Sequence, residues 1–426
     1  MTKPIGPICN LDCKYCFYLE KEVLYPAVSK WAMRDDVLEA YVRQYIQSQP
    51  ADVIHFAWQG GEPTLLGVDY FRKVVEFQAR FANGKNIENA LQTNGTLLND
   101  AWGEFLAEHR WLVGISIDGP REMHDAYRVD KGGQPTFDRV LRGIEVLNKH
   151  RVAFNTLTTV HRANMHRPLE VYRFLREIGS GYMQFIPIVE RISQGAAPHG
   201  LSLIAPGFAG DAVVAPWSVE AESYGRFLCS IFDEWVRKDV GRVFVQLFDV
   251  SLEMWMGMEA SLCVFRRTCG SELAMEHSGD VYSCDHFVYP ENKLGNIMEA
   301  ALDTMADSSQ QRSFGTSKND TLPQYCRQCE VRFACNGECP KHRFLTTPQG
   351  EPGLNYLCAG YKMFFKHIDP CMRFMAEELR HQRAPANIMR TFQVPDAKPP
   401  RRPARNQLCV CGSGRKYKQC CMREGP

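Results

Sequence analysis

Short apolar runs rich in β-forming residues alternate with amphipathic helical patterns between about residues 50 and 250. The strand candidates are 53–59, 88–94, 111–118, 153–160, 182–189 and 242–248. The segments 69–81 and 136–150 carry apolar residues three and four positions apart, as expected of helices with one buried face. Strands that alternate with helices form parallel sheets, so the pattern predicts an α/β fold with an open or barrel-like sheet.

The alternation is interrupted at 190–217, a stretch rich in Gly, Ala and Pro that predicts a long surface loop. A helix is predicted over 220–238, and the strand and helix rhythm fades after residue 250. The segment 395–407 is rich in Pro and Arg and predicts an extended, exposed linker. The chain therefore divides into a large N-terminal unit, a second unit and a short tail.

Charge and hydropathy exclude some partners. The 426 residues include 50 Lys plus Arg and 49 Asp plus Glu, a net charge of +1, so no overall field recruits nucleic acid or an anionic membrane. The N-terminus has no signal-peptide pattern, and no run of about 18 apolar residues occurs. These features predict a cytoplasmic protein that acts without a membrane or nucleic acid.

The chain has 17 cysteines, an odd number for a disulfide framework in a chain without an export signal, so metal binding is the better interpretation. They gather at the N-terminus, between Cys263 and Cys358, and at the C-terminus. Cys229 and Cys371 stand apart and are predicted to be small buried apolar side chains.

The N-terminal trio Cys9, Cys13 and Cys16 has the spacing C-x3-C-x2-C. Three thiolates on a four-iron cluster leave one iron open to a reacting molecule, whereas zinc sites usually take four ligands. A zinc knuckle or free thiols are the alternatives. The motif, with Tyr15 before its last cysteine, resembles the signature of radical S-adenosylmethionine (SAM) enzymes, in which the open iron binds SAM.

Four downstream segments resemble the next signatures of radical SAM enzymes: "QGGEP" (59–63), "LQTNGTLL" (91–98), "SIDG" (116–119) and "HDAYRVDKGG" (124–133). The resemblance implies a partial (β/α)6 barrel and a set of SAM contacts. Gly60, Gly61 and Glu62 would meet the amino group, Ser116 and Asp118 the ribose and methionine portion, Arg128 the carboxylate, and Tyr15 and Val189 the adenosine. A solvated surface role is the alternative for Arg128.

The second cysteine group has the spacing C-x5-C-x9-G-x4-C, then C-x2-C-x5-C-x3-C, then a final cysteine. It resembles the SPASM extension of peptide-modifying radical SAM enzymes, which carries two auxiliary iron–sulfur clusters. The resemblance implies a crossed pairing. The first cluster would take Cys263, Cys269, Cys284 and Cys339, and the second Cys326, Cys329, Cys335 and Cys358. Two zinc sites on the same eight residues remain open.

The segments "KPIGPICNLDCKYCFYLEKE" and "QGGEPTLLG", together with the pattern around 335–344, resemble the anaerobic sulfatase-maturating enzymes over residues 3 to about 375. The resemblance implies oxidation of Cys or Ser in a sulfatase C/S-x-P-x-R motif to Cα-formylglycine. A 5′-deoxyadenosyl radical made from SAM would remove a Cβ hydrogen. The implied partners are an unfolded or nascent sulfatase chain and an electron donor such as flavodoxin or ferredoxin.

Asp285 directly follows Cys284, at the position where this family carries its proposed proton acceptor. Burial beside a cluster is expected to raise its pKa toward that of a useful base. A capping role in a turn is the alternative, and His286 is a weaker candidate in support of Asp285. Two other functions stay open: a maturase that crosslinks a different peptide, and a zinc-binding adaptor.

The tail resembles the SEC-C motif, with Cys409, Cys411, Cys420 and Cys421 as zinc ligands. Its basic segment is either a docking site for a partner or a solvated run of charge. The predicted units are a radical SAM core (1–217), a connecting helix and strand (218–260), a SPASM domain with two clusters (261–385), a linker (386–404) and the SEC-C motif (405–421).

Overall fold

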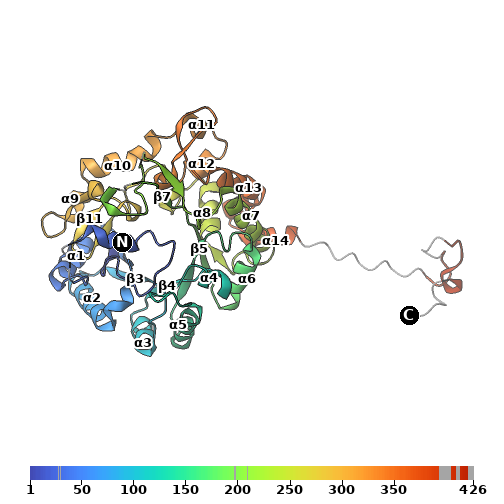
Figure 1. Cartoon of the computed structure of the whole chain (residues 1–426). Coiled ribbons are helices and arrows are strands. Elements are labelled where there is room, and N and C mark those ends of the chain that lie inside the picture. The colour runs from blue at the N-terminus through green and yellow to red at the C-terminus, as the bar shows by residue number, and fades with distance from the viewer. Residues whose placement is uncertain are drawn as a thin grey trace.

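A ten-stranded sheet forms the centre of the molecule, in the order β12-β11-β10-β1-β2-β3-β4-β5-β6-β9 (Figure 1). The computed structural model describes residues 1–26, 28, 30–195, 198–208, 210–392, 404–408 and 413–420. Six neighbouring strands run parallel: β1 (Thr2–Lys3), β2 (Val53–Trp58), β3 (Asn86–Thr93), β4 (Leu112–Ser116), β5 (Phe154–Val160) and β6 (Tyr182–Pro187). The predicted α/β fold is confirmed.

Helices connect these strands and surround them in Figure 1: α1 (Asp35–Ser48), α2 (Val68–Phe81), α3 (Asp100–Glu108), α4 (Arg121–Asp125), α5 (Phe137–His150) and α6 (Pro168–Glu177). Alternate residues of β2, Phe56 and Trp58 among them, are buried, and Trp58 packs against Tyr41 of α1 and Phe71 of α2. The apolar side of β2 therefore faces these helices, as period-two alternation requires.

The strand expected at 242–248 is mostly wrong. The segment contains only the two-residue strand β9 (Phe244–Val245), which pairs in parallel with β6, and α8 (Gln246–Trp255) begins directly after it. Leu247, Val250 and Met254 are buried at helical spacing, which the short window did not reveal. The sequence pattern also missed β1, which is too short to produce a hydrophobic pattern and lies in the sheet between β2 and β10.

The segment 190–217 is also more ordered than a surface loop. It contains the antiparallel pair β7 (Arg191–Ser193) and β8 (Ala212–Val214). Leu201, Leu203 and Ile204 within it are buried. Apolar side chains scattered among Gly and Pro anchor this segment, although they show no period.

The cysteine-rich region extends the same sheet. β10 (Ala274–Glu276) pairs in parallel with β1, and β11 (Asp280–Tyr282) and β12 (Lys293–Asn296) follow antiparallel. The remaining elements here are α9 (Leu302–Ala306), α10 (Ser309–Asp320), α11 (Gln324–Arg327), α12 (Arg332–Cys335), β13 (Leu345–Thr346) and β14 (Pro352–Leu354). Because β1 lies between β2 and β10, the N-terminus joins the parallel strands to the cysteine-rich region.

Helices α7 (Ala221–Lys238) and α13 (Cys358–Arg380) cross at two glycines. A Cβ on Gly225 would lie 2.7 Å from Gly360 Cα, and one on Gly360 would lie 2.0 Å from the Ala221 oxygen. The backbones therefore touch. Beyond α13, α14 (Ile388–Thr391) packs its buried Ile388 on the folded body, so the first residues of the predicted linker are structured.

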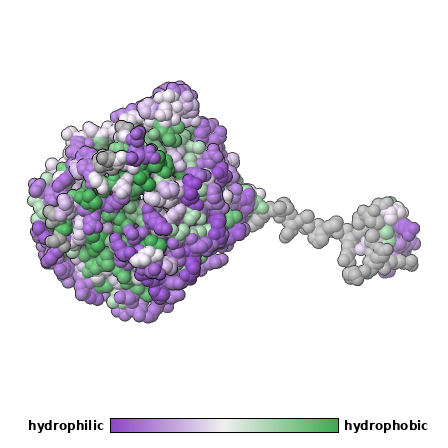
Figure 2. All heavy atoms as spheres, in the orientation of Figure 1, coloured by the Kyte–Doolittle hydropathy of each residue, from purple (hydrophilic) through white to green (hydrophobic). Residues whose placement is uncertain are grey.

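Short 3-10 turns complete the described chain: η1 (Leu19–Leu24), η2 (Pro63–Leu66), η3 (Pro198–Gly200), η4 (Cys263–Phe265), η5 (Asp285–Phe287), η6 (Pro290–Asn292), η7 (Pro340–His342), η8 (Pro385–Asn387) and η9 (Tyr417–Gln419). Figure 2 shows hydrophobic residues in patches near the middle of this face, with hydrophilic residues around them. None of the helices in the described ranges has the length and apolar character that a membrane crossing requires.

Candidate active site

The N-terminal cysteine trio lies on the loop between β1 and η1. The backbone N–H of Leu11 donates to Cys9 Sγ at 3.3 Å, and Asn94 Nδ2 donates to the same sulfur at 3.7 Å. Burial raises the pKa of the Cys13 thiol to about 12. Arg128 opposes this rise, and the Cys16 and Cys9 thiols add to it. The three thiols therefore share one partly buried site, and their mutual repulsion favours binding of a cationic metal group.

The "QGGEP" segment packs against this cysteine loop. Gly61 N donates to Gly6 O at 2.7 Å, and Glu62 N donates to Ile8 O at 2.8 Å. The Glu62 carboxylate is fully buried and accepts four hydrogen bonds, from the backbone N–H and hydroxyl of Thr64, the hydroxyl of Thr93 and the backbone N–H of Asn94. The Glu62 side chain is therefore not available to a ligand, whereas the backbone of Gly60 and Gly61 is.

Replacing Gly61 with alanine is expected to displace the cysteine loop. The new Cβ would lie 1.9 Å from the Ile8 oxygen, a backbone atom that cannot rotate away. Overpacking of this kind destabilises by about 1–3 kcal/mol. We expect a lower unfolding temperature and less iron per chain after anaerobic reconstitution. Gly181→Ala, at a glycine with no neighbour within 4 Å, is the control, and equal behaviour of the two variants would contradict this explanation.

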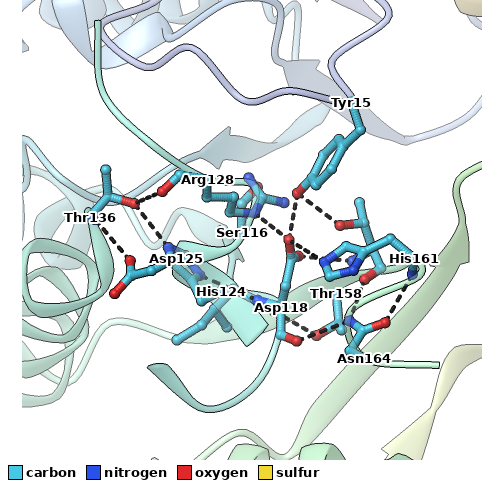
Figure 3. A network of polar contacts seen from close by, with 12 residues as sticks. Tyr15, Ser116, Asp118, His124, Asp125, Arg128, Thr136, Thr158, His161 and Asn164 are labelled. Atoms are coloured by element: carbon cyan, nitrogen blue, oxygen red, sulfur yellow. Dashed lines mark hydrogen bonds and ion pairs between the residues drawn. The ribbon is translucent and has the colours of Figure 1, made fainter. Parts of the chain in front are cut away.

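Asp118 lies at the centre of a buried polar network (Figure 3). Its Oδ2 accepts from Tyr15 OH at 2.5 Å and from Arg128 Nε at 2.9 Å, and His161 Nε2 lies 3.3 Å away. Its Oδ1 accepts from Thr159 N at 3.0 Å. Burial acts to raise the pKa of Asp118, but Arg128 and His161 outweigh it and hold that pKa well below its usual range.

The family resemblance implied that Asp118 contacts the ribose and methionine portion of SAM, and this network gives its side chain another role. Because its carboxylate is fully buried and bonded inward, its side chain positions Arg128 and Tyr15 and has no oxygen left for a ligand. Arg128 is also buried, so the alternative of a solvated surface arginine is wrong. Its Nη atoms make no hydrogen bond within the described part of the chain, which leaves them available to an anion.

The other predicted SAM residues lie at the ends of two strands. Ser116 ends β4, and its hydroxyl accepts from Gln92 Nε2 at 3.1 Å. Val189 follows β6 and is buried in the main core at 2% exposure. Parallel strands place their carboxyl ends along one edge, so these residues and Gly60 lie on the same edge of the sheet.

The eight cysteines between 263 and 358 separate into two groups. Cys326, Cys329, Cys335 and Cys358 line one small cavity. In the other group, burial raises the pKa of the Cys284 thiol to about 12, and Asp285, Cys263 and Cys269 add to the rise. Burial likewise raises the pKa of Cys339, to which Cys284 and Cys269 contribute. This grouping agrees with the crossed pairing, while ligation itself stays a prediction.

Asp285 lies where the N-terminal strand meets the cysteine-rich region. Its Oδ1 is 2.5 Å from Lys3 Nζ, and Gln59 Nε2 donates to its Oδ2 at 3.4 Å. Burial acts to raise the pKa of Asp285, but Lys3 and His286 outweigh it, and the pKa lies below its usual value. The expected raised pKa is therefore wrong, because the sequence did not reveal the lysine partner 282 residues away.

Lys3, Gln59 and Tyr18 are site residues that the sequence reasoning missed. Lys3 Nζ lies 3.7 Å from the centre of the Tyr18 ring, and Tyr18 OH donates to the buried Glu276. All three stand inside motifs already singled out, at "KPIGPIC", "QGGEP" and "CKYCFY". Their place beside the motif glycines and cysteines was the available signal, but only the fold shows that Lys3 and Gln59 contact Asp285 and that Tyr18 contacts Lys3.

A cavity of about 250 Å³ adjoins both sites. Its lining includes Phe17, next to Cys16, and His286, next to Asp285. Lys341 and Glu190 also line it and pair with each other at 2.5 Å. The cavity therefore lies beside residues that directly follow Cys16 and Asp285 in the sequence.

The side chains of the described residues were also compared with the donor sets that single metal ions require. Among the residues with described positions, no three His, Cys, Asp or Glu side chains converge closely enough for a single metal ion. Three of the four tail cysteines, Cys409, Cys411 and Cys421, lie outside the described residues. Cys420 Sγ lies 3.2 Å from Ser413 Oγ. The zinc site of the tail stays a prediction.

Three known protein families match parts of this chain. The radical SAM superfamily model matches residues 4–175, the iron-sulfur cluster-binding domain matches 263–330, and the SEC-C motif matches 405–423. A serine-type anaerobic sulfatase-maturating enzyme from Bacteroides thetaiotaomicron is 49% identical over 393 residues, which cover 92% of this chain and 94% of that protein. This chain belongs to the anaerobic sulfatase-maturating enzymes.

Other anaerobic sulfatase-maturating enzymes are also similar to this chain over most of its length. A cysteine-type enzyme from Clostridium perfringens is 32% identical over 89% of this chain and 98% of its own length. The solved structure of native anSMEcpe with bound AdoMet and Cp18Cys peptide has a TM-score of 0.76, with 32% identity over 88% of this chain and 98% of that one. Family membership confirms a radical SAM enzyme with SAM and iron–sulfur cofactors.

Proposed function

We propose that this chain oxidises one Ser or Cys side chain in a sulfatase C/S-x-P-x-R motif to Cα-formylglycine. The observation that carries the proposal is the 49% identity to a serine-type maturating enzyme over 92% of the chain. The solved relative with a bound peptide supports a polypeptide substrate. A flavodoxin or ferredoxin is the proposed electron donor.

The N-terminal site supports the radical chemistry. Cys9, Cys13 and Cys16 would hold the catalytic cluster, and their shared, partly buried loop fits three ligands of one metal group. When bound, the cluster and SAM supply one-electron chemistry that can remove hydrogen from an unactivated carbon. Arg128 is held at Nε by Asp118 and keeps its Nη atoms available for the SAM carboxylate, in the planar geometry that suits a carboxylate.

Asp285 is the proposed proton acceptor. Lys3 and Gln59 hold its carboxylate in place, and His286 beside it lines the cavity. A substrate side chain in that cavity can release its hydroxyl or thiol proton to an Asp285 oxygen as the Cβ centre is oxidised. Cys284 adjoins Asp285, so the first auxiliary cysteine group is placed to hold the acceptor of the surplus electron.

Peptide turnover tests the proposal. Anaerobically reconstituted enzyme is incubated with SAM, a reductant and matched peptides that carry Ser, Cys or Ala at the first motif position. We expect formylglycine in the Ser or Cys peptide by mass spectrometry, with 5′-deoxyadenosine released in step, and no product from the Ala peptide. Release of 5′-deoxyadenosine without formylglycine in either peptide would instead favour a maturase with another peptide substrate.

A further inference from the structure

A left-handed turn joins the two auxiliary cysteine groups. Asn336, Gly337 and Glu338 have φ values of 44°, 72° and 49° and connect Cys335 of the second group to Cys339 of the first. L-residues disfavour this region, and a run of three is held only where the surroundings determine it. The turn therefore needs partners, and it fixes how far apart the two cysteine groups lie.

Arg343 holds this turn from one side. Its Nε donates to Gly337 O at 2.8 Å, and its Nη2 donates to Asn336 O at 3.0 Å and Glu338 O at 3.1 Å. Its Nη1 donates to Lys318 O at 2.5 Å. One guanidinium thus binds the carbonyl of every residue between the two cysteines. A Cβ on Gly337 would lie 2.7 Å from Nη2, so the glycine permits this approach.

The other side of the turn is held through Glu338. Its side chain is 2% exposed, and Oε2 accepts from Asn355 Nδ2 at 2.6 Å and lies 2.9 Å from His342 Nδ1. Glu338 therefore already has its own partners, and Arg343 makes no ion pair with a carboxylate within the described chain. Within the described chain, the Arg343 guanidinium is therefore held by backbone carbonyls.

The charge of Arg343 acts on both groups. Burial lowers the pKa of Arg343, and Glu338 and the thiols of Cys326, Cys339 and Cys335 oppose that change. Cys339 belongs to the first group, and Cys326 and Cys335 belong to the second. A fixed cation near a cluster favours its more negative, reduced form, because net charge and hydrogen bonding set cluster potentials.

We propose that Arg343 is a positioning residue for both auxiliary cysteine groups: it holds the turn that spaces them, and its charge raises the reduction potentials of the clusters they bind. This inference rests on the proposed function, in which the eight cysteines hold two clusters. It predicts that the geometric and electrostatic effects of Arg343 can be separated, since lysine keeps the charge and loses the multiple hydrogen bonds.

The experiment uses the full chain with Cys9, Cys13 and Cys16 replaced by alanine, so that only auxiliary clusters give a signal. Arg343→Lys and Arg343→Gln are compared with Arg380→Gln. Arg380 is the control, because its Nη2 also donates to a backbone carbonyl, that of Trp255 at 3.0 Å, while the residue lies at the opposite end of α13 from Cys358. Midpoint potentials are measured by redox titration with electron paramagnetic resonance, and iron release to a chelator is timed.

We expect iron release about 10-fold faster or more in both Arg343 variants, as for loss of a residue that orients ligands. The potentials should fall in Arg343→Gln and stay near the parent value in Arg343→Lys. If Arg343→Gln does not assemble clusters, the lysine variant decides: parent-like iron release would overturn the proposal. Equal potentials and equal release in all variants would also overturn it. A parent chain without auxiliary iron would overturn the proposed function as well.

Discussion

Asp285→Asn is expected to reduce formylglycine production by about 10²- to 10⁴-fold, the range typical of removing a general base. Asparagine keeps the size of the side chain and the contact with Gln59, but it cannot accept the substrate proton. Hydrogen removal from the substrate precedes or accompanies that step, so 5′-deoxyadenosine should still form. The measurement is the ratio of formylglycine to 5′-deoxyadenosine in a timed peptide reaction.

Asp280→Asn is the matched control for this substitution. Asp280 lies on the neighbouring strand β11 and pairs with Lys293 at 2.6 Å, much as Asp285 pairs with Lys3 at 2.5 Å. Loss of a lysine-bound carboxylate is therefore common to both variants, and only Asp285 adjoins the cavity through His286. Wild-type turnover in Asp285→Asn would remove Asp285 from the mechanism.

Asp118→Asn is expected to have the largest effect on stability, lowering the free energy of unfolding by about 3–5 kcal/mol. The substitution leaves the buried Arg128 guanidinium without its counter-charge and gives Tyr15 a weaker acceptor. Denaturant unfolding of the cluster-free chain measures this loss. Since Arg128 is then held less firmly, SAM binding to the reconstituted enzyme should also weaken.

Asp138→Asn is the control that separates the effect of burial on stability from the effect of losing an ion pair. Arg121 donates to Asp138 at 2.7 and 2.5 Å, so this pair has equally good geometry, but both side chains are more than half exposed. Solvent screens such a pair, and we expect a much smaller change in stability. If Asp118→Asn and Asp138→Asn unfold alike, the buried network does not stabilise the core domain in the way described.

The sequence identified most of the candidate site because its chemistry is local. The spacing of Cys9, Cys13 and Cys16 places three thiols on one short loop whatever surrounds them. The grouping of the eight later cysteines was implied by the family resemblance and not by local spacing, since Cys339 joins Cys284 only through the fold. The sequence erred where a role depended on distant partners: Asp118 is bonded inward by Tyr15 and Arg128, and Asp285 has a lowered pKa because Lys3 lies beside it.

The strands likewise divide into those that local sequence predicts and one that only the fold explains. Longer segments such as β2 and β5 are rich in β-branched and aromatic residues, which predict them from the residues alone. β1 has only two residues, and it becomes a strand because β2 and β10 pair with it on both sides. Its hydrogen bonds come from residues more than fifty positions away, and no window around Thr2 contains them.

The sequence by itself determined the metal-binding motifs, the α/β class and the family resemblance, since spacing and periodicity are properties of neighbouring residues. Only the tertiary structure decided that β1 joins the parallel strands to the cysteine-rich region and that Lys3 pairs with Asp285. It also decided that Arg343 holds the turn between the two cysteine groups. These contacts join elements whose approach depends on packing of the whole chain, so their geometry and electrostatics exist only after folding.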